Sequence, residues 1–447
     1  MDYIPNTEED YKEMLAEIGV RSFDELVQEV PESLRQKKMV LPQGLSEPEV
    51  LKLLGELADK NHDGKGALSF LGAGAYDHYI PTIVNHLAGR SEFYTAYTPY
   101  QPEASQGTLQ AIFEYQTLMS ELTGLPVSNA SLYDGATAVA EAAMAAFNSF
   151  RDRYDFLVAS TLHPEYLQTL KTYLAGLPLN FKLIPHQNGV LDLEFIEKNI
   201  TETTAGVLVQ SPNFFGCIEE MEAIGKIAAT TNAVFVACVN PISLGVLQAP
   251  GEYGAQIAVG EAQCLGNPLG FGGPYLGFFA AAEHLVRKVP GRIVGETLDK
   301  EGRRAFVLTL QAREQHIRRE KAVSNICTNQ SLIALRSAIY LCAVGKEGIA
   351  EVGRQNILKS QFAKEEIGKL KGYKIKYSAP TFNEFVVQCP KNAEEIFNRL
   401  AKKEIVPGLP LGRFYKEQVN DLLVCVTETK SKKEIEKLVQ ALGAISE

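Results

Sequence analysis

Short apolar segments alternate with amphipathic ones through the middle of the chain, from about residue 108 to residue 285. Strands that are buried on both faces of a sheet have this continuous apolar character. Stretches with helical periodicity lie between several of them, at residues 164–174 and 219–231. Buried strands that alternate with helices indicate parallel βαβ units. We therefore expect a large α/β domain, with strands at residues 156–160, 206–210, 234–238, 257–259 and 275–280.

The two ends of the chain have a different pattern. Near the N-terminus, Thr7, Ser22 and Ser46 each precede an acidic residue by three positions, which is the spacing of a helix capping box. After about residue 345, a lysine-rich helical stretch is followed by strand-like and helical segments that predict a small α+β domain. We expect three parts, an N-terminal helical arm (1–65), a large α/β domain (66–345) and a small C-terminal α+β domain (346–447).

Composition narrows the class of protein. The chain has 447 residues and a formal net charge of −10, which does not favour binding to nucleic acid. Hydrophobic residues make up 45%, and no apolar run is long enough to cross a bilayer. The seven cysteines are scattered without a CxxC pair, as in a reduced protein with no metal site. With an N-terminus unlike a signal peptide, we expect a cytoplasmic protein that binds neither metal nor membrane.

Two glycine-containing stretches are candidates for a ligand site. Residues 129–138 (NASLYDGATA) lead into an Ala-rich helix, and the free N–H groups at a helix start can bind a phosphate. A capped and closely packed helix start is the alternative for Asp134, Gly135 and Thr137. Residues 266–274 (GNPLGFGGP) form a turn in which Gly272 and Gly273 would let the backbone approach a ligand or a neighbouring subunit. A tight connector is equally compatible with this pattern.

Other candidate residues are aromatic or basic. His163 follows a predicted strand, where it could stack on a cofactor ring or simply cap a helix. Tyr94, Tyr97 and Tyr100 lie on a proline-containing loop, which suggests recognition of a partner or substrate, or packing of the arm. The basic run at residues 313–321 is either an anion or partner site or a solvated helix face.

Several of these stretches resemble one protein family. Residues 96–107 (AYTPYQPEASQG), 129–138 (NASLYDGATA), 313–322 (REQHIRREKA) and 324–327 (SNIC) are characteristic of the N-terminal half of glycine cleavage system P-proteins. The resemblance covers nearly the whole chain, and its length matches members in which the two halves are separate polypeptides. It implies the architecture of fold-type-I pyridoxal-phosphate enzymes, with a large, mostly parallel sheet domain, an N-terminal helical arm and a small C-terminal domain.

Two positions depart from what a pyridoxal-phosphate enzyme requires. Such an enzyme holds its cofactor as a Schiff base on a lysine, but no lysine lies between Lys226 and Lys288. Similarity to the catalytic half of the family puts Gln263 at the lysine position. It also puts Ala237 where an aspartate would contact the pyridine nitrogen. We therefore expect no catalytic residue on this chain alone, and only a vestigial cofactor pocket formed by Asp134, Gly135, Thr137, His163, Gly272 and Gly273.

The resemblance also implies a reaction and its partners. The family's complex decarboxylates glycine with pyridoxal phosphate and transfers the aminomethyl group to the lipoyl group of H-protein. We expect the cofactor to be covalently bound to a lysine-bearing second subunit, in a heterodimer or heterotetramer. Loop residues of this chain would then complete the partner's active site, with Tyr94, Tyr97, Tyr100 and Gln101 as the candidates.

Two other functions stay open at this point. A stand-alone pyridoxal-phosphate enzyme would need its Schiff-base lysine elsewhere, at Lys321 or Lys288. A non-enzymatic scaffold derived from the same fold would need no lysine at all.

Overall fold

The computed structural model describes residues 6–35, 41–61 and 66–446. Contacts divide the chain into two compact units, Met1–His62 and Asp63–Glu447. Within the described part of the first unit, Leu15 is the one buried hydrophobic residue. This unit consists of short helical elements, α1 (Glu8–Ile18), α2 (Phe23–Leu26), η1 (Glu32–Leu34) and α3 (Glu47–Ala58).

Two of the three predicted capping boxes in the first unit are confirmed. Thr7 caps α1 together with Asp10, and Ser46 caps α3 together with Glu49. The prediction at Ser22 is wrong, because its side chain makes no capping hydrogen bond and Glu25 accepts from the backbone of Arg21 instead.

A seven-stranded sheet forms the centre of the second unit, in the order β2-β10-β9-β8-β7-β3-β4. Strands β9, β8, β7, β3 and β4 are mutually parallel, whereas β10 is antiparallel to both of its neighbours. The large, mostly parallel sheet expected from the sequence is therefore confirmed. The strands are β2 (Val127–Ser128), β3 (Asp155–Ala159), β4 (Asn180–Ile184), β7 (Thr204–Gln210), β8 (Val234–Cys238), β9 (Ile257–Glu261) and β10 (Gly277–Ala281).

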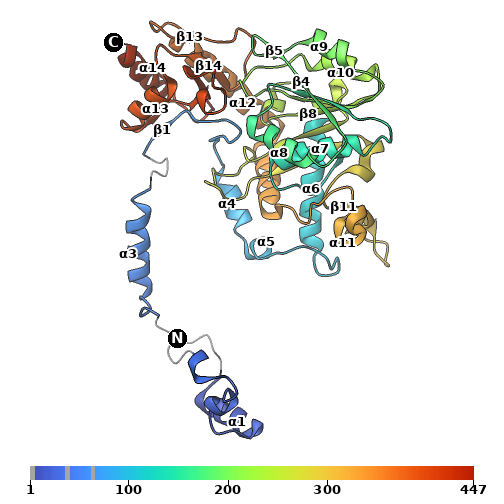
Figure 1. Cartoon of the computed structure of the whole chain (residues 1–447), viewed down its shortest axis with the longest axis vertical. Coiled ribbons are helices and arrows are strands. Elements are labelled where there is room, and N and C mark those ends of the chain that lie inside the picture. The colour runs from blue at the N-terminus through green and yellow to red at the C-terminus, as the bar shows by residue number, and fades with distance from the viewer. Residues whose placement is uncertain (1–5, 36–40, 62–65, 447) are drawn as a thin grey trace. The chain divides into compact units, whose positions relative to one another are not determined.

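Helices cover this sheet (Figure 1). The Ala-rich helix α7 packs across β7 to β10, and its small side chains allow the close approach, since ten of its residues are buried. The remaining helices extend the layers on and around the sheet. They are α4 (Thr82–Ala88), α5 (Ser91–Tyr94), α6 (Gln106–Thr123), α8 (Pro164–Leu174), α9 (Leu193–Asn199), α10 (Met221–Ala229) and α11 (Gln315–Arg318).

A second, antiparallel sheet has the order β13-β14-β17-β16 and its own hydrophobic core. Helices α13 (Ala393–Ala401) and α14 (Lys432–Ser446) pack with it, drawn in orange and red in Figure 1. The long helix α12 (Ser331–Gly368) packs against helices α4 and α6 of the large domain and against β13 and β14 of the second sheet. The strands of this sheet are β13 (Lys374–Ile375), β14 (Glu384–Gln388), β16 (Leu409–Pro410) and β17 (Asp421–Cys425).

Some elements differ from the sequence-based expectation. Helix α12 begins at Ser331, well before the helical stretch that was expected after about residue 345, and continues through a break at Gly345. The hairpin formed by β11 (Ile293–Leu298) and β12 (Arg304–Thr309) was not predicted. Two short pairs, β5 (His186–Gln187) with β6 (Val190–Leu191) and β1 (Leu68–Ser69) with β15 (Ile405–Val406), complete the sheets. Among the described residues, no helix is both long and apolar enough to cross a membrane.

Candidate functional site

Most of the predicted site residues lie at the carboxyl ends of the parallel strands of the large sheet, which we call the sheet edge. In open α/β sheets, ligands bind in the crevice outside the carboxyl ends of the strands. Here β9 ends at Glu261, two residues before Gln263, and β3 ends at Ala159, four residues before His163. The first turn of α7, which begins at Gly135, reaches the same edge through its hydrogen bond to Glu261.

The side chain of Gln263 is buried and fully hydrogen-bonded. Its Oε1 accepts from the backbone N–H of Tyr76 at 2.9 Å, and its Nε2 donates to the carbonyl oxygens of Tyr76 at 3.0 Å and Asn267 at 2.7 Å. The residue is 1% exposed. The amide therefore fixes the backbone of a distant loop, and both of its N–H groups are already used.

The N-terminus of α7 binds a carboxylate from this chain. Asp134 caps the helix by accepting from the N–H of Thr137 at 2.7 Å. The N–H of Gly135, which has no partner within the helix, donates to Glu261 Oε2 at 2.9 Å. Glu261 Oε1 accepts from the backbone N–H groups of Gln263 and Leu276. Burial raises the pKa of Glu261 to about 7, although these three N–H donors oppose the rise. An internal carboxylate thus occupies the position where a helix start would bind a phosphate.

Close packing makes glycine necessary at position 135. A Cβ on Gly135 would lie 2.6 Å from the Tyr166 hydroxyl and 2.9 Å from the Glu261 Cβ. The predicted helix start is therefore capped and tightly packed, which was the alternative to a phosphate site.

A loop formed by residues 72–76 runs through this edge of the sheet. The N–H of Ala73 donates to Glu384 Oε1 and the Tyr76 hydroxyl donates to Glu384 Oε2, both at 2.7 Å. The carbonyl of Ala73 lies 2.9 Å from Nε2 of His163. Burial raises the pKa of Glu384 to about 7, because these two donors only partly replace its lost hydration. The loop thus contacts both the large sheet edge and β14 of the small sheet.

His163 contacts this loop and an aromatic neighbour within the chain. Its Nδ1 accepts from the N–H of Glu165 at 3.2 Å, which leaves Nε2 as the donor to Ala73 in the neutral ring. Burial lowers the pKa of His163, in agreement with a neutral imidazole. Its ring stacks on Tyr166, with centroids 4.6 Å apart and an interplanar angle of 24°. His163 therefore already has a stacking partner in Tyr166.

Ala237 lies in the middle of the large sheet. It pairs with Val209 of β7 and Ala258 of β9 and is fully buried. Its neighbours in β8 are Val236 and Cys238, so β8 itself presents no carboxylate at this point. Nothing in this strand would keep a pyridine nitrogen protonated.

The two glycines of the glycine-rich turn lie apart from these contacts. Gly272 and Gly273 are exposed, and the N–H of Gly273 donates to the carbonyl of Gly270 at 2.8 Å. A Cβ on Gly272, where φ is +96°, would meet nothing within 4 Å. The structure brings Asp134, Gly135, His163 and Gln263 to one sheet edge, while the hydrogen bond of Gly273 stays within its own turn.

The residues at the sheet edge do not fit pyridoxal phosphate. Gln263 cannot form an imine, and its amide is committed to the loop backbone. Glu261 takes the N–H of Gly135 that a phosphate would need, and its charge would repel one. The ring of His163 is stacked on Tyr166, and its Nε2 is hydrogen-bonded to the loop at residues 72–76.

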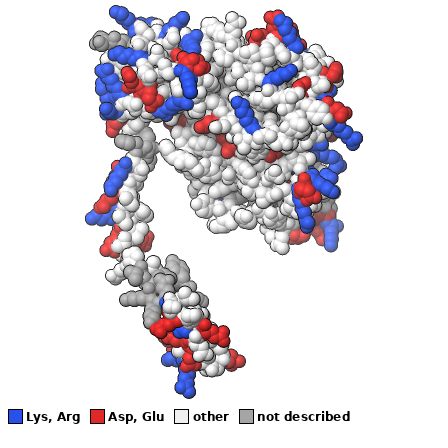
Figure 2. Space-filling view, viewed as in Figure 1, with Lys and Arg blue, Asp and Glu red and all other residues white. Residues whose placement is uncertain are grey.

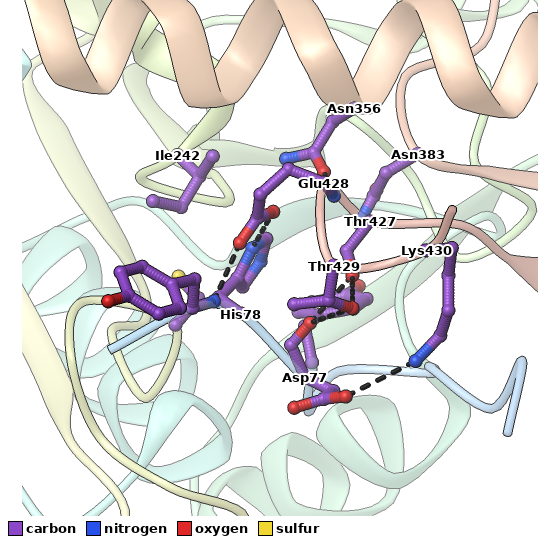
Figure 3. Close-up of polar contacts among 12 residues, drawn as sticks. Asp77, His78, Ile242, Asn356, Asn383, Thr427, Glu428, Thr429 and Lys430 are labelled. Atoms are coloured by element: carbon purple, nitrogen blue, oxygen red, sulfur yellow. Dashed lines mark hydrogen bonds and ion pairs between the residues drawn. The ribbon is translucent and has the colours of Figure 1, made fainter. Parts of the chain in front are cut away.

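A second set of contacts holds the continuation of this loop, and sequence analysis did not identify it (Figure 3). Glu428 accepts from Nδ1 of His78 and from the N–H of Tyr79, both at 2.7 Å. Asp77 receives hydrogen bonds from Thr427 Oγ1 at 2.6 Å and from Lys430 Nζ at 3.2 Å. Burial acts to raise the pKa of Glu428, but hydrogen bonds from His78 and the backbone leave it below its ordinary value. Residues 77–79 are thus fastened to the segment after β17.

The tyrosine loop, which we define as residues 94–101, is strongly exposed. Tyr94, Tyr97 and Tyr100 have exposed fractions of 66%, 85% and 58%, and Gln101 is also exposed. The Tyr100 side chain is tethered, because its hydroxyl accepts from Nη2 of Arg292 at 3.3 Å. Figure 2 shows a broad face with few Lys, Arg, Asp or Glu side chains over α4, α5 and the first part of α12. Exposed tyrosines beside a charge-poor face are typical of a protein interface.

The basic run divides into a buried and an exposed part. Arg313 is 8% exposed and its Nη1 donates to the carbonyl of Val289. The basic residues after it, His316, Arg318, Arg319 and Lys321, are all exposed. A uniformly solvated helix face therefore does not describe this segment, in which α11 is a single turn.

Comparisons with known proteins agree on one family. The family profile described as "Glycine cleavage system P-protein" matches residues 1–442. Proteins named "Probable glycine dehydrogenase (decarboxylating) subunit 1" from Bacillus mycoides (strain KBAB4) and Bacillus cereus (strain B4264) are each 52% identical over 444 residues. Each of these alignments covers 99% of both chains.

Solved structures show the same relationship and the fold. A crystal structure of glycine decarboxylase (P-protein) of the glycine cleavage system, in inhibitor-bound form, is 42% identical with a TM-score of 0.90 and covers 100% of both chains. A cysteine desulfurase from Thermococcus onnurineus NA1 is 17% identical, with a TM-score of 0.64 over 91% of this chain and 99% of that chain. The second similarity concerns the fold alone, and it agrees with the expected fold-type-I architecture.

Proposed function

The chain belongs to the glycine cleavage system P-protein family, and on that premise we propose that it is the cofactor-free subunit of a two-chain glycine decarboxylase. Membership makes it a P-protein subunit, and the complex is an oxidoreductase that acts on glycine. The observation that carries the proposal is Gln263, whose buried amide holds the backbone of Tyr76 at the position where a cofactor lysine is expected. Pyridoxal phosphate would accordingly be held by the second subunit.

The stand-alone enzyme is the weaker alternative. Lys288 donates to the carbonyl of Asn148, the residue that ends α7. With 13 residues and a rise of about 1.5 Å per residue, α7 puts Asn148 roughly 20 Å from the helix start at Gly135. Lys321 is an exposed residue of the basic run. Neither lysine has a contact with Gln263, Glu261 or His163 that would favour it as the Schiff-base residue. Similarity to proteins named glycine dehydrogenase (decarboxylating) subunit 1 favours an enzyme subunit over a scaffold without any enzymatic role.

The second subunit is the partner that the surface favours. Tyr94, Tyr97 and Tyr100 present aromatic surface beside a face with few charges, and interface centres are rich in aromatic residues and poor in charged ones. The tyrosine loop, with Gln101, would reach the partner's active site and help to bind glycine or to exclude water. The same complex would receive lipoylated H-protein in the cytoplasm, as the family resemblance implies.

The test is reconstitution. We expect the purified chain to be colourless and inactive in glycine–carbon dioxide exchange with H-protein. Mixed with the lysine-bearing subunit, it should give a yellow, active complex. A yellow and active chain on its own would show that the cofactor is bound here after all. Within the active complex, Tyr97→Ala should lower exchange activity at least tenfold. The matched control is Tyr154→Ala, which should stay within twofold. Tyr154 is an exposed tyrosine that lies just before β3, at the amino ends of the parallel strands.

A further inference from the structure

Arg292 is a buried cation at the base of the tyrosine loop. It is 5% exposed and immediately precedes β11. Its Nη1 donates to Thr328 Oγ1 at 3.1 Å and to Asn329 Oδ1 at 2.9 Å. Its Nη2 donates to the carbonyl of Cys327 at 3.2 Å and to the Tyr100 hydroxyl at 3.3 Å, with the guanidinium 5.6 Å from the centre of the Tyr100 ring.

All four of these acceptors are neutral oxygens. Among the residues that the structure describes, no Asp or Glu lies within ion-pair distance of Arg292. A buried charge without a counter-charge is costly, and proteins normally pair it or bind an ion there. The guanidinium is therefore held by four hydrogen bonds, while no described residue supplies a counter-charge to it.

Three characteristic stretches of the sequence meet at this arginine. The tyrosine loop contributes Tyr100, and the segment after residues 324–327 contributes Thr328 and Asn329. Residues 129–138 take part from the other side, because the N–H of Ala130 donates to the carbonyl of Arg292 at 2.8 Å and Asn329 Nδ2 donates to the carbonyl of Ala130. Segments separated by up to about two hundred positions in the chain are thus organised around one side chain.

Tyr100 is exposed to solvent, as are its neighbours in this cluster, Cys327 and Thr328. A phenol has one O–H donor, and its oxygen can accept at the same time. Because the Tyr100 oxygen accepts from Arg292, its own proton points away from the guanidinium and is available to an outside acceptor. The adjacent cation strengthens that donor, and an anionic acceptor would also supply the missing counter-charge.

We propose that Arg292 is a positioning residue that fixes the Tyr100 hydroxyl as a hydrogen-bond donor to an anionic group, a carboxylate or a phosphate, in the active site of the second subunit. The inference rests on the proposed function, since it requires the two-chain complex. Two sources share this chemistry, the carboxylate of the glycine substrate and the phosphate of the partner's cofactor.

The experiment uses the reconstituted complex with Arg292→Met, Arg292→Lys, Tyr100→Phe and the double variant Arg292→Met/Tyr100→Phe. The matched control is Arg304→Met, which removes an exposed arginine from the neighbouring hairpin. Glycine affinity is read from the change in cofactor absorbance on titration. Cofactor affinity is read from reconstitution with pyridoxal phosphate and, separately, with pyridoxal, which lacks the phosphate.

If the anion is the substrate carboxylate, Arg292→Met and Tyr100→Phe each weaken glycine binding about tenfold and leave cofactor affinity unchanged. If it is the phosphate, both variants weaken pyridoxal phosphate about tenfold and leave pyridoxal unchanged. In either case the double variant loses about tenfold rather than a hundredfold, because the residues act through one contact. Arg292→Lys retains part of the affinity, and Arg304→Met equals the wild type.

The inference is overturned if the single variants stay within twofold of wild type in both titrations, or if their effects multiply in the double variant. If the complex with Arg292→Met does not assemble, the same two titrations of Tyr100→Phe and Arg292→Lys test the inference, with the same twofold limit. An inactive wild-type complex would instead contradict the proposed function.

Discussion

Gln263, which we expect at the position of the Schiff-base lysine, has a structural role in this chain. Its amide makes three hydrogen bonds of 2.7–3.0 Å to the backbone of Tyr76 and Asn267. A lysine at this position would have no acceptor function for the Tyr76 N–H, and its ammonium would be buried. We therefore expect Gln263→Lys to lower the free energy of unfolding by about 1–3 kcal/mol and not to bind pyridoxal phosphate.

Urea unfolding and absorbance after addition of the cofactor check this expectation. Gln110→Lys, on the exposed side of α6, is the matched control and should change stability by less than about 0.5 kcal/mol. A yellow band in Gln263→Lys that borohydride abolishes would show that the pocket needs only its lysine.

Glu141 gives the subunit a measurable pH dependence. It is 3% exposed, and burial raises its pKa to about 7 from an ordinary value of 4.5. The folded chain therefore binds this proton more tightly than the unfolded chain. The resulting loss of stability is absent below about pH 4.5 and grows to about 3 kcal/mol as the pH rises through about 7.

Glu141→Gln should remove this contribution, so its free energy of unfolding should fall less steeply than that of the wild type between pH 5 and pH 8. Glu261 and Glu384 keep part of the slope, because burial raises their pKa values to about 7 as well. Urea titrations at several pH values measure the slopes. The exposed Glu121→Gln should match the wild type, and identical slopes for Glu141→Gln would contradict the prediction.

At the scale of elements, α12 depends on a glycine that is not helical. Gly345 has φ 62° and ψ −176°, a conformation that essentially only glycine adopts. A Cβ there meets nothing within 4 Å, so the cost of a substitution is in the backbone rather than in packing. We expect Gly345→Ala to destabilise the chain by about 1–3 kcal/mol, measured by thermal unfolding.

Gly368, the last residue of the same helix, provides the control. A Cβ there would make an ordinary contact with Ile375 at 3.7 Å, so Gly368→Ala should be neutral or stabilising by about 0.5 kcal/mol. If both substitutions change the stability equally, the backbone conformation at position 345 does not require glycine.

Elements that have one clear local pattern, an apolar run or a helical periodicity, could be predicted from the sequence. The continuous apolar run at β8 was predicted with its observed bounds, Val234–Cys238, and α8 was predicted as Pro164–Leu174. Strand β4 was missed because three of its five residues are exposed and polar residues interrupt it, so that it has no apolar run. The start of α12 was missed because Gly345 and its surroundings interrupt the helical periodicity.

The site was predictable only where a residue type is itself informative. An absent lysine and an absent aspartate can be recognised in the sequence, which led to Gln263 and Ala237. The contacts of residues 72–79 could not be, because Tyr76 meets Gln263 and Glu384 across 187 and 308 positions of chain. Arg292 was missed for the same reason, since nothing in its immediate neighbours indicates burial without a counter-charge.

At the scale of the whole molecule, charge is distributed unevenly. Although the chain has a net charge of −10, Figure 2 shows few Lys, Arg, Asp or Glu side chains on the face over α4, α5 and the first part of α12. Tyr79, Tyr94 and Tyr97 add exposed aromatic surface in and next to α4 and α5 in the sequence. An even spread of charge would have favoured a protein that acts alone, whereas this distribution favours one that works with a partner.

The fastening of residues 72–79 also governs how the molecule moves. Gln263 and His163 hold these residues from the large sheet, while Glu384 and Glu428 hold them from the small one. In enzymes that close around a substrate, the loops that close over the site must also open, on a microsecond to millisecond timescale. We expect the amides of Ala73 and Tyr76 to exchange with deuterium as slowly as those of β8, and far more slowly than the exposed backbone around Tyr97. Exchange as fast as that of Tyr97 would indicate that residues 72–79 open frequently. Slow exchange would indicate that these residues stay closed, so that the motions needed for catalysis take place in the partner subunit.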